Sequence, residues 1–474
     1  MQDKIPKKFA SWPQAVRAQG GSLYKAIVKV IETEVREGRL KPGEQLPSQR
    51  SLADLLEIDF TTVGAAYKHA REQGLLQSHK GAGTFVSGER PGAQAGNGAA
   101  DDPAPAKDAP IDLSTSWPPN LDIAAMLADE VRQVTHARSF DFLARRSGGI
   151  PTLDRTSGQA WLQPRFDMPL EGRVAMAAGT RNALIALLAR VVGSGGKLLV
   201  ESMCWPTVRT LAAVLNIELV PVALDAEGIE PGALDTAAKA SGAKALYCVP
   251  SLQNPTGAVM GLERRQALIV VARRHGITLI EDDAYGELQS APPPLLGSLA
   301  PDITYSLFGL AKLVAPSLRV CYVVAPDAPA SERLVEMLRA TMQSAPPLEA
   351  ALATHLIRNN MLGTLIERVR NEAATRQKMA HEALRPHGLT GSVEGLFCWL
   401  PLPRSWDASE FATRLRREGV LVAPAKSFSI APATAPNAVR IATGAVPTTE
   451  ALAQALQCIA TLLPQNPSLL SAID

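Results

Sequence analysis

Long apolar segments and paired cysteines are both missing from this sequence of 474 residues. No uncharged apolar run approaches the ~18 residues of a membrane helix, and the N-terminal MQDKIPKKFASWPQ lacks the apolar core of a signal peptide. We therefore expect a cytoplasmic protein that has no membrane partner. The five cysteines contain no CxxC pair, so we expect neither a disulfide framework nor a zinc site, and we predict no bound metal.

The chain has enough hydrophobic residues for folded domains. It is 46% hydrophobic and 20% charged, a balance that excludes disorder throughout, and its length exceeds that of one core, so we expect at least two domains. Of its 48 basic and 46 acidic residues, 14 basic and 10 acidic ones lie in residues 1–90. This basic surplus favours a nucleic-acid partner for the N-terminal part.

Residues 88–110 form the clearest boundary. Gly, Pro and Ala occupy 15 of these 23 positions, and apart from proline no apolar residue larger than Ala occurs there. Such a segment cannot build a core, so we predict a flexible linker. The predicted organisation is an N-terminal extension at 1–20, a first domain at 21–87, the linker, and a second domain at 111–474.

The first domain is predicted to contain three helices and a hairpin. Apolar residues with helical spacing fill residues 23–35, a short helix follows Ser48, the expected N-cap, and a third helix begins near residue 61. Residues 75–77 and 84–86 have the pattern of a two-stranded hairpin. This order of elements is typical of a winged helix-turn-helix domain.

Two runs in this domain, LPSQRSLA at 46–53 and TVGAAY at 62–67, resemble the GntR family of bacterial winged-helix repressors. The resemblance implies binding to double-stranded operator DNA. Backbone N–H groups, a hydroxyl and a guanidinium at one helix N-terminus suit a phosphate. The predicted DNA contacts are Ser48 and Arg50 at that N-terminus, Thr61, Thr62 and Lys68 on the third helix, and Lys80 and Gly83 in the hairpin.

Some of these positions have a second interpretation. Capping for Thr61 and solvation for Lys68 are about as plausible as a DNA contact. Where many family members have an Arg, this chain has Phe60. An aromatic ring there either packs in the domain core or touches a thymine methyl group, so the usual base contact is not predicted at this position.

Beyond the linker, strand-like and helix-like runs alternate, which predicts an α/β fold with a mainly parallel sheet covered on both faces. Helical patterns occupy residues 181–192 and 264–275, and a small α+β subdomain is expected at the C-terminus, after residue 347. Strands are expected at 197–200, 218–224, 245–249, 277–281, 304–308 and 319–324.

Three polar residues follow the ends of predicted strands, where ligands bind in open α/β sheets. Asp282 lies 28 residues after Asn254, and Lys312 lies 30 residues after Asp282. A pyridoxal 5'-phosphate (PLP) site needs an amine for the aldehyde, a carboxylate for the pyridine nitrogen, and donors for the phenolate oxygen and the phosphate. We assign these tasks to Lys312, Asp282, Asn254 with Tyr285, and the helix N-terminus at Gly179 and Thr180, with Arg319 as a further cation and Trp205 stacked on the ring.

This set resembles the fold-type I aminotransferases, from residue 111 to the C-terminus. By the same resemblance, Arg440 corresponds to the arginine that holds a substrate carboxylate, and Gly309 replaces a phosphate-binding Ser, so one phosphate hydrogen bond is expected to be missing. A winged helix followed by such a domain is the architecture of the MocR subfamily of GntR regulators, which the whole chain resembles. The resemblance implies a homodimeric regulator that senses an amine or amino-acid-like effector through PLP bound as an aldimine to Lys312, the catalytic residue.

Two rival functions stay open at this point. A genuine PLP-dependent aminotransferase with an appended DNA-binding domain would carry the same residues. A regulator that has lost the cofactor would instead bind the free vitamer or another ligand. Taken singly, Trp205 is also explained by packing and Arg440 by a strand-end ion pair.

Overall fold

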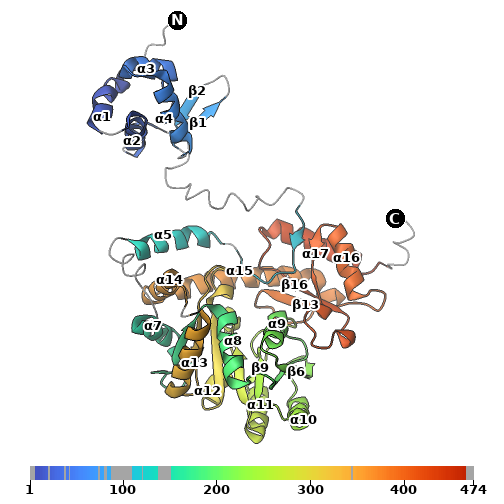
Figure 1. The fold of residues 1–474 in the computed structure, drawn as a ribbon. Helices are drawn as coiled ribbons and strands as arrows, with labels where there is room; N and C mark the ends of the chain where they lie inside the picture. The colour runs from blue at the N-terminus through green and yellow to red at the C-terminus, as the bar shows by residue number, and fades with distance from the viewer. Residues whose placement is uncertain are drawn as a thin grey trace. The chain divides into compact units, whose positions relative to one another are not determined.

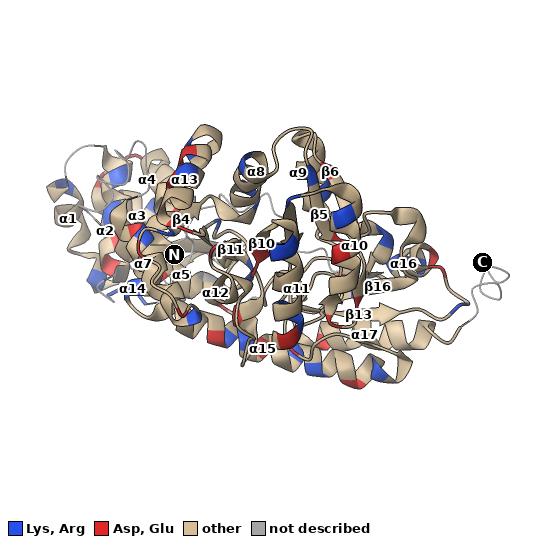
Figure 2. Ribbon diagram, turned by 90° about the horizontal axis from the view of Figure 1, so that it is seen from below, with Lys and Arg blue, Asp and Glu red and all other residues tan. Residues whose placement is uncertain are grey.

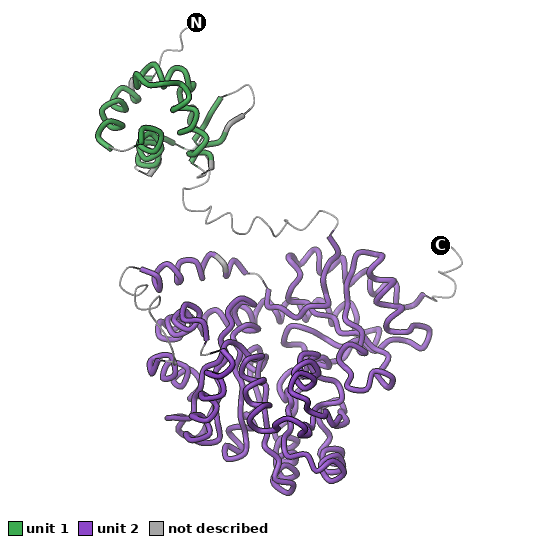
Figure 3. The backbone as a smooth tube through the Cα atoms, viewed as in Figure 1, with its two compact units in different colours: residues 1–107 green, residues 108–474 purple. Residues whose placement is uncertain are grey.

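The structure is a computed structural model that describes residues 6–19, 22–36, 39–41, 43–72, 75–79, 83–86, 109–119, 121–136, 151–342 and 345–465. The chain divides into two compact units, residues 1–107 and residues 108–474 (Figure 3). Within the described ranges, no helix combines the length and the apolar character that crossing a bilayer requires.

The first unit has the predicted winged helix-turn-helix fold. Helices α2 (Leu23–Arg36), α3 (Gln49–Leu56) and α4 (Phe60–Glu72) precede a hairpin of β1 (Leu76–His79) and β2 (Gly83–Val86) (Figure 1). The two strands are antiparallel. The Ser48 side chain accepts a hydrogen bond from the Ser51 amide and caps α3, as expected for its position.

A further helix that no pattern above predicts belongs to this unit. Helix α1 (Trp12–Ala18) has Pro13 in its first turn, a position where the missing N–H costs nothing. Phe9, Trp12 and Val16 are buried in one hydrophobic cluster with residues of α2, α3 and α4. Residues of the expected N-terminal extension therefore contribute to the core of the first unit.

The second unit is built around a seven-stranded sheet with the order β4-β12-β11-β10-β9-β5-β6. The hydrogen-bonded neighbours are parallel except where β12 takes part, so the sheet is mainly parallel, as predicted. The strands are β4 (Val174–Ala177), which was not predicted, β5 (Lys197–Glu201), β6 (Glu218–Val222), β9 (Ala245–Cys248), β10 (Thr278–Asp282), β11 (Thr304–Gly309) and β12 (Cys321–Val324). A separate small hairpin pairs β7 (Leu224–Asp225) with β8 (Gly228–Ile229).

Helices cover both faces of this sheet (Figure 1). Those on one face are α7 (Thr152–Leu162), α8 (Gly179–Val191), α13 (Ala328–Met342) and α14 (Pro347–Arg358), and those on the other are α10 (Pro231–Ser241), α11 (Leu262–His275) and α12 (Leu296–Leu299). Along β9, Ala245 and Tyr247 belong to the hydrophobic cluster of the first face, whereas Leu246 and Cys248 belong to that of the second. This division follows from the alternation of side chains along a strand.

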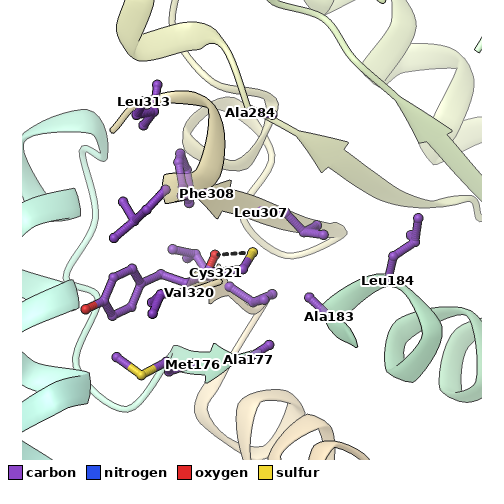
Figure 4. Packing of buried hydrophobic residues seen from close by; sticks show 14 of the residues in the cluster. Met176, Ala177, Ala183, Leu184, Ala284, Leu307, Phe308, Leu313, Val320 and Cys321 are labelled. Carbon is purple, nitrogen blue, oxygen red and sulfur yellow. Dashed lines mark hydrogen bonds between the residues drawn. The ribbon is translucent and has the colours of Figure 1, made fainter. Parts of the chain in front are cut away.

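The first of these clusters joins strands and helix tightly. Figure 4 shows part of it, including Met176 and Ala177 from β4, Leu307 and Phe308 from β11, and Ala183 and Leu184 from α8. All five cysteines are unpaired, and four of them are buried. Three further helices belong to this unit: α5 (Ile123–Thr135), α9 (Pro206–Val214) and the long α15 (Met361–Leu384), which carries charges of both signs along its length (Figure 2).

The α+β subdomain that was predicted at the C-terminus follows α15. Its antiparallel sheet has the order β13 (Phe397–Pro401), β16 (Ala438–Ala442) and β15 (Ala423–Pro424), and its helices are α16 (Ala408–Arg417) and α17 (Thr449–Leu462). The first strand of the unit, β3 (Ile111–Asp112), pairs in parallel with β14 (Val420–Leu421). The residues that follow the linker in sequence are therefore attached to the C-terminal subdomain.

Candidate functional site

One cavity of the second unit brings together all nine residues that the sequence assigns to the cofactor and the effector. Its volume is about 590 Å³. Strands β10 and β11 have their C-terminal ends at this cavity, and ligands of parallel sheets bind at that edge. The assigned residues in its lining are Gly179, Thr180, Trp205, Asn254, Asp282, Tyr285, Lys312, Arg319 and Arg440.

The Asp282 side chain faces the cavity because side chains alternate between the two faces of strand β10. The preceding residue, Glu281, is directed to the opposite face, where it is fully buried and its Oε1 lies 3.4 Å from Nη1 of Arg265. The amides of Leu296 and Gly297 also donate to Glu281, over 2.8 and 3.0 Å. This network holds β10 in register, and Asp282 faces the cavity as a result.

The Asp282 carboxyl group lies in an apolar setting. The Tyr247 hydroxyl donates to Oδ2 over 2.8 Å, whereas Oδ1 is buried and has no hydrogen-bond partner of normal geometry in the described part of the chain. Burial raises the pKa of Asp282 to about 6, and the hydrogen bond from Tyr247 opposes that rise. Oδ1 is thus an acceptor that a protonated ring nitrogen in the cavity would satisfy.

Lys312 ends a short 3-10 turn that follows β11. Its Nζ donates to the backbone carbonyl of Ser116 over 2.6 Å and lies 3.9 Å from the centre of the Trp117 ring. Burial, together with the positive charges of Arg440 and Arg319, lowers the pKa of Lys312 to about 7. Near neutral pH a large fraction of the amine is therefore uncharged and nucleophilic.

Arg440 is buried in strand β16, between two aromatic rings. Its Cζ lies 5.4 Å from the centre of the Phe397 ring and 4.7 Å from that of Phe428. Nη1 donates to Asn254 Oδ1 over 2.8 Å, Nη2 donates to the Ser114 carbonyl, and Nε is buried without a partner among the described residues. Burial lowers the pKa of Arg440 to about 10, so the group stays charged at neutral pH. It is a fixed cation with an open donor.

The N-terminus of α8 forms another edge of the cavity. The first amides of a helix have no intrahelical acceptor, so Gly179 and Thr180 offer donors to an anion. Gly179 has a φ of +79°, a conformation that residues with a side chain disfavour. A Cβ at Gly309 would collide with Thr180 Oγ1, so the Ser common in the family would require Thr180 to move.

Aromatic rings paired with cations complete the lining. Trp205 lies directly before α9, and the Arg181 guanidinium carbon is 5.7 Å from the centre of its ring. The Arg319 guanidinium carbon is 5.7 Å from the centre of the Trp117 ring. Trp205 is therefore at the cavity, and its stacking on a pyridine ring stays a prediction.

Sequence reasoning missed two groups in this lining. Tyr247 is the one hydroxyl-bearing residue of the otherwise apolar strand β9, a signal that was present in the sequence. Ser114, Ser116 and Trp117 follow the linker and contact Arg440, Tyr285 and Lys312, which are 169 to 326 positions away. No local pattern marks such contacts.

The first unit presents most of its predicted DNA-contacting residues to solvent. Ser48, Arg50, Thr61, Lys68 and Gly83 are exposed, Thr62 is half-buried, and Lys80 lies outside the described residues. Phe60 is 47% exposed, and Cζ of Arg50 lies 6.0 Å from the centre of its ring, so Phe60 does not pack in the core. The Thr61 amide and hydroxyl both donate to the Asp59 side chain, so Asp59 caps the N-terminus of α4 and the Thr61 hydroxyl is engaged within the helix end.

Comparisons with known proteins agree with both units. Residues 147–459 match the family described as aminotransferase class I and II, and residues 23–86 match the bacterial regulatory proteins of the gntR family. An archaeal alanine:glyoxylate aminotransferase superposes with a TM-score of 0.69 at 22% identity, over 75% of this chain and 91% of that one, a likeness of fold.

Two curated relatives match across both units. The chain is 29% identical to the uncharacterized HTH-type transcriptional regulator YdeF of Bacillus subtilis, over 96% of this chain and 97% of that protein. It is 27% identical to the vitamin B6 salvage pathway transcriptional repressor PtsJ of Salmonella typhimurium, over 86% and 92%. With a GntR-type helix-turn-helix unit joined to an aminotransferase class I and II unit, the chain belongs to the MocR subfamily of GntR-type regulators.

Proposed function

We propose that this protein is a DNA-binding transcriptional regulator that senses an amine or amino-acid-like effector through PLP held at Lys312. One observation carries the proposal: a half-buried amine and a buried carboxylate oxygen, which has no hydrogen-bond partner of normal geometry among the described residues, line the same cavity of about 590 Å³. The names of the relatives, which are transcriptional regulators, support the DNA-binding part.

The residues present suit PLP, which when bound supplies an aldehyde that forms covalent bonds with amines. Asp282 would hold a proton on the pyridine nitrogen through Oδ1. Lys312 would attack the aldehyde with its uncharged amine. Because Asn254 Oδ1 already accepts from Arg440, the Asn254 amide nitrogen is left to donate to the phenolate oxygen, beside the Tyr285 hydroxyl.

The phosphate would lie at the N-terminus of α8. The amides of Gly179 and Thr180 and the helix dipole favour an anion there, and Arg319 adds a positive charge. Trp205 would form the wall beside the ring. With Gly309 in place of Ser, these groups would hold the phosphate with one hydrogen bond fewer, a difference of roughly 1.5 to 3 kcal/mol.

The amine of the effector would lie at Lys312, and the carboxylate of the effector would bind Arg440. A guanidinium fork suits a carboxylate, and the aromatic rings on both sides of Arg440 keep water from competing. The DNA would meet Ser48, Arg50 and the exposed side of α4 in the first unit. A cytoplasmic homodimer with two half-sites on its operator completes the proposal.

Absorption spectroscopy combined with a DNA mobility-shift assay tests the proposal. The purified full chain should gain a visible absorption band on addition of PLP, the band should change with some members of a panel of amines and amino acids, and the same compounds should change DNA binding. A protein that stays colourless after PLP addition would instead support a regulator without the cofactor.

A genuine aminotransferase is the second candidate, because Lys312, Asp282 and Tyr285 are the groups that proton transfer and amine exchange require and they share one cavity. Steady turnover of an amino donor with a 2-oxo acid acceptor, at about 1 per second or faster, would favour this function. Spectral changes without turnover favour the sensor.

A further inference from the structure

Residues near the start of the second unit line the cavity. Residues 114–117, which we call the strap, contribute Ser114, Ser116 and Trp117 to its lining. In sequence, the strap begins six residues after position 108, where the second unit starts. It is therefore the part of the cavity wall that lies nearest along the chain to the linker and the first unit.

The strap is anchored on its N-terminal side to the C-terminal subdomain. The Ile111 amide donates to the Gly419 carbonyl over 2.7 Å, and the Leu113 amide donates to the Leu421 carbonyl over 2.8 Å. The Ala442 amide donates to the Leu113 carbonyl over 2.8 Å. Ala442 lies two residues from Arg440 in β16, so the strap and the candidate effector-binding strand share hydrogen bonds.

Within the cavity, the strap accepts hydrogen bonds from the two basic side chains that the proposed function assigns to ligands. The Ser114 carbonyl accepts from Arg440 Nη2, and the Ser116 carbonyl accepts from Lys312 Nζ. The Ser116 hydroxyl lies 3.4 Å from the Tyr285 hydroxyl, and the Trp117 ring faces Lys312. Backbone oxygens thus already accept from the groups that would bind a carboxylate and an aldehyde.

The geometry of a guanidinium makes this occupation matter for a carboxylate. A two-pronged carboxylate contact uses either Nη1 with Nη2 or Nε with Nη2. Both modes include Nη2, the nitrogen that donates to Ser114. An arriving carboxylate and the Ser114 carbonyl would then compete for the hydrogens of one nitrogen, and the carboxylate charge repels the partial negative charge of the carbonyl oxygen.

A displacement of Ser114 would be passed to the strand before it. The Asp112 side chain accepts hydrogen bonds from the amide and the hydroxyl of Ser114, over 2.7 and 2.6 Å. Asp112 belongs to β3, and from β3 the chain continues directly to the linker.

We propose that the strap transmits the binding of an effector carboxylate from Arg440 to the linker. The carboxylate displaces the Ser114 carbonyl, and Asp112 carries that movement to β3. This inference rests on the proposed function. It adds that the signal requires a carboxylate, since a ligand without one leaves Ser114 on Arg440.

Hydrogen exchange on the full chain tests the displacement with two stable probes. N-(5'-phosphopyridoxyl)-L-alanine and pyridoxamine 5'-phosphate share the ring and the phosphate, but only the first carries a carboxylate. We expect amides of residues 109–119 to exchange about tenfold faster with the first probe than with the second, as for loss of one charge-assisted hydrogen bond. In the Arg440→Gln variant, this difference should disappear.

Each other outcome has a distinct meaning. If both probes bind and exchange in 109–119 is the same with either, the strap does not respond to the carboxylate and the inference is wrong. If neither probe binds to the wild-type chain, the proposed function fails, and the inference fails with it. Binding of both probes is measured by calorimetry on the same samples.

A matched pair of variants tests transmission to DNA. Asp112→Ala removes the acceptor that holds Ser114, whereas Asp112→Asn keeps an acceptor oxygen and removes only the charge. With a DNA fragment selected by the protein in vitro, phosphopyridoxyl-L-alanine should change the dissociation constant for wild type and Asp112→Asn, and the ratio should fall to about 1 for Asp112→Ala. An unchanged ratio in Asp112→Ala, or a ratio of 1 in wild type with the probe bound, overturns the inference.

Discussion

The two candidate sites of this protein are built in opposite ways. In the first unit, Ser48 and Thr61 are exposed, and their side chains contact residues three and two positions away. In the second unit, Lys312 and Arg440 are held by backbone carbonyls 196 and 326 positions away. A local motif is therefore sufficient for the exposed site, whereas the chemistry of the buried site exists only after distant segments have packed together.

Removal of the Lys312 amine should have the largest effect. We expect Lys312→Ala to lose the visible absorption of bound PLP and the covalent trapping of PLP in the cavity by borohydride, because no other group in the proposed site forms that bond. The exposed Lys239→Ala serves as the control and should behave like wild type. A Lys312→Ala protein that is still labelled by borohydride at the cavity would refute the assignment.

Asp282→Asn should weaken PLP binding and stabilise the ligand-free protein. PLP affinity should fall by about 10- to 100-fold, because the carboxylate partner of the ring nitrogen is lost. The protein without ligand should instead become more stable at pH 7.5, by at most about 3 kcal/mol, as measured by chemical denaturation.

The sign of that stability effect follows from the pKa of Asp282, which burial raises from 3.8 to about 6. Above pH 6 the folded chain holds a carboxylate that water would solvate better, and this penalty shrinks as the pH falls toward 3.8. The gain from Asp282→Asn should therefore be smaller at pH 5 than at pH 7.5. An equal gain at both pH values would contradict the burial of the charge.

The rate of PLP capture should rise between about pH 6 and pH 8, because burial lowers the pKa of Lys312 to about 7 and only the uncharged amine attacks. Removal of a neighbouring positive charge in Arg440→Gln should raise that pKa and move the rise to higher pH. Arg416→Gln is the control, since Arg416 lines the cavity without being among the groups that lower the pKa of Lys312. Stopped-flow absorbance gives both profiles.

The smallest effect is expected at the exposed site. Arg50→Ala should weaken binding to all DNA sequences and reduce the slope of log affinity against log salt by about 1, because one phosphate contact is lost. Lys29→Ala, an exposed change on α2, is the control. A change in sequence preference without a change in salt dependence would show that Arg50 reads bases instead.

Much of the architecture could be predicted because it rests on local patterns. The apolar spacing of α2, the Ser48 cap and the alternation of strands with helices each lie within a short stretch of sequence. Helix α1 was missed although Phe9, Trp12 and Val16 have helical spacing. Strand β4 was missed because its four residues, VAMA, carry no pattern that distinguishes a strand from a buried helix.

The residues of the candidate site could be predicted from the sequence, but the hydrogen bonds between them could not. Asn254, Asp282 and Lys312 could be named because each lies beyond the end of a strand, or at it, and parallel strands end on one edge. The bond from Arg440 to Asn254 and the strap across the cavity depend on where the C-terminal subdomain packs. Sequence spacing contains no information on that packing.

The last two residues of strand β10 are both acidic, and their side chains face opposite sides of the sheet. Glu281 is neutralised by Arg265 on one side, and Asp282 faces the cavity on the other. Loss or gain of a single residue within this strand would exchange the faces of the two side chains, so neither carboxyl group would reach the partners that it has now. Divergent copies of this protein should therefore accumulate point changes in β10 far more easily than insertions or deletions, even of one codon.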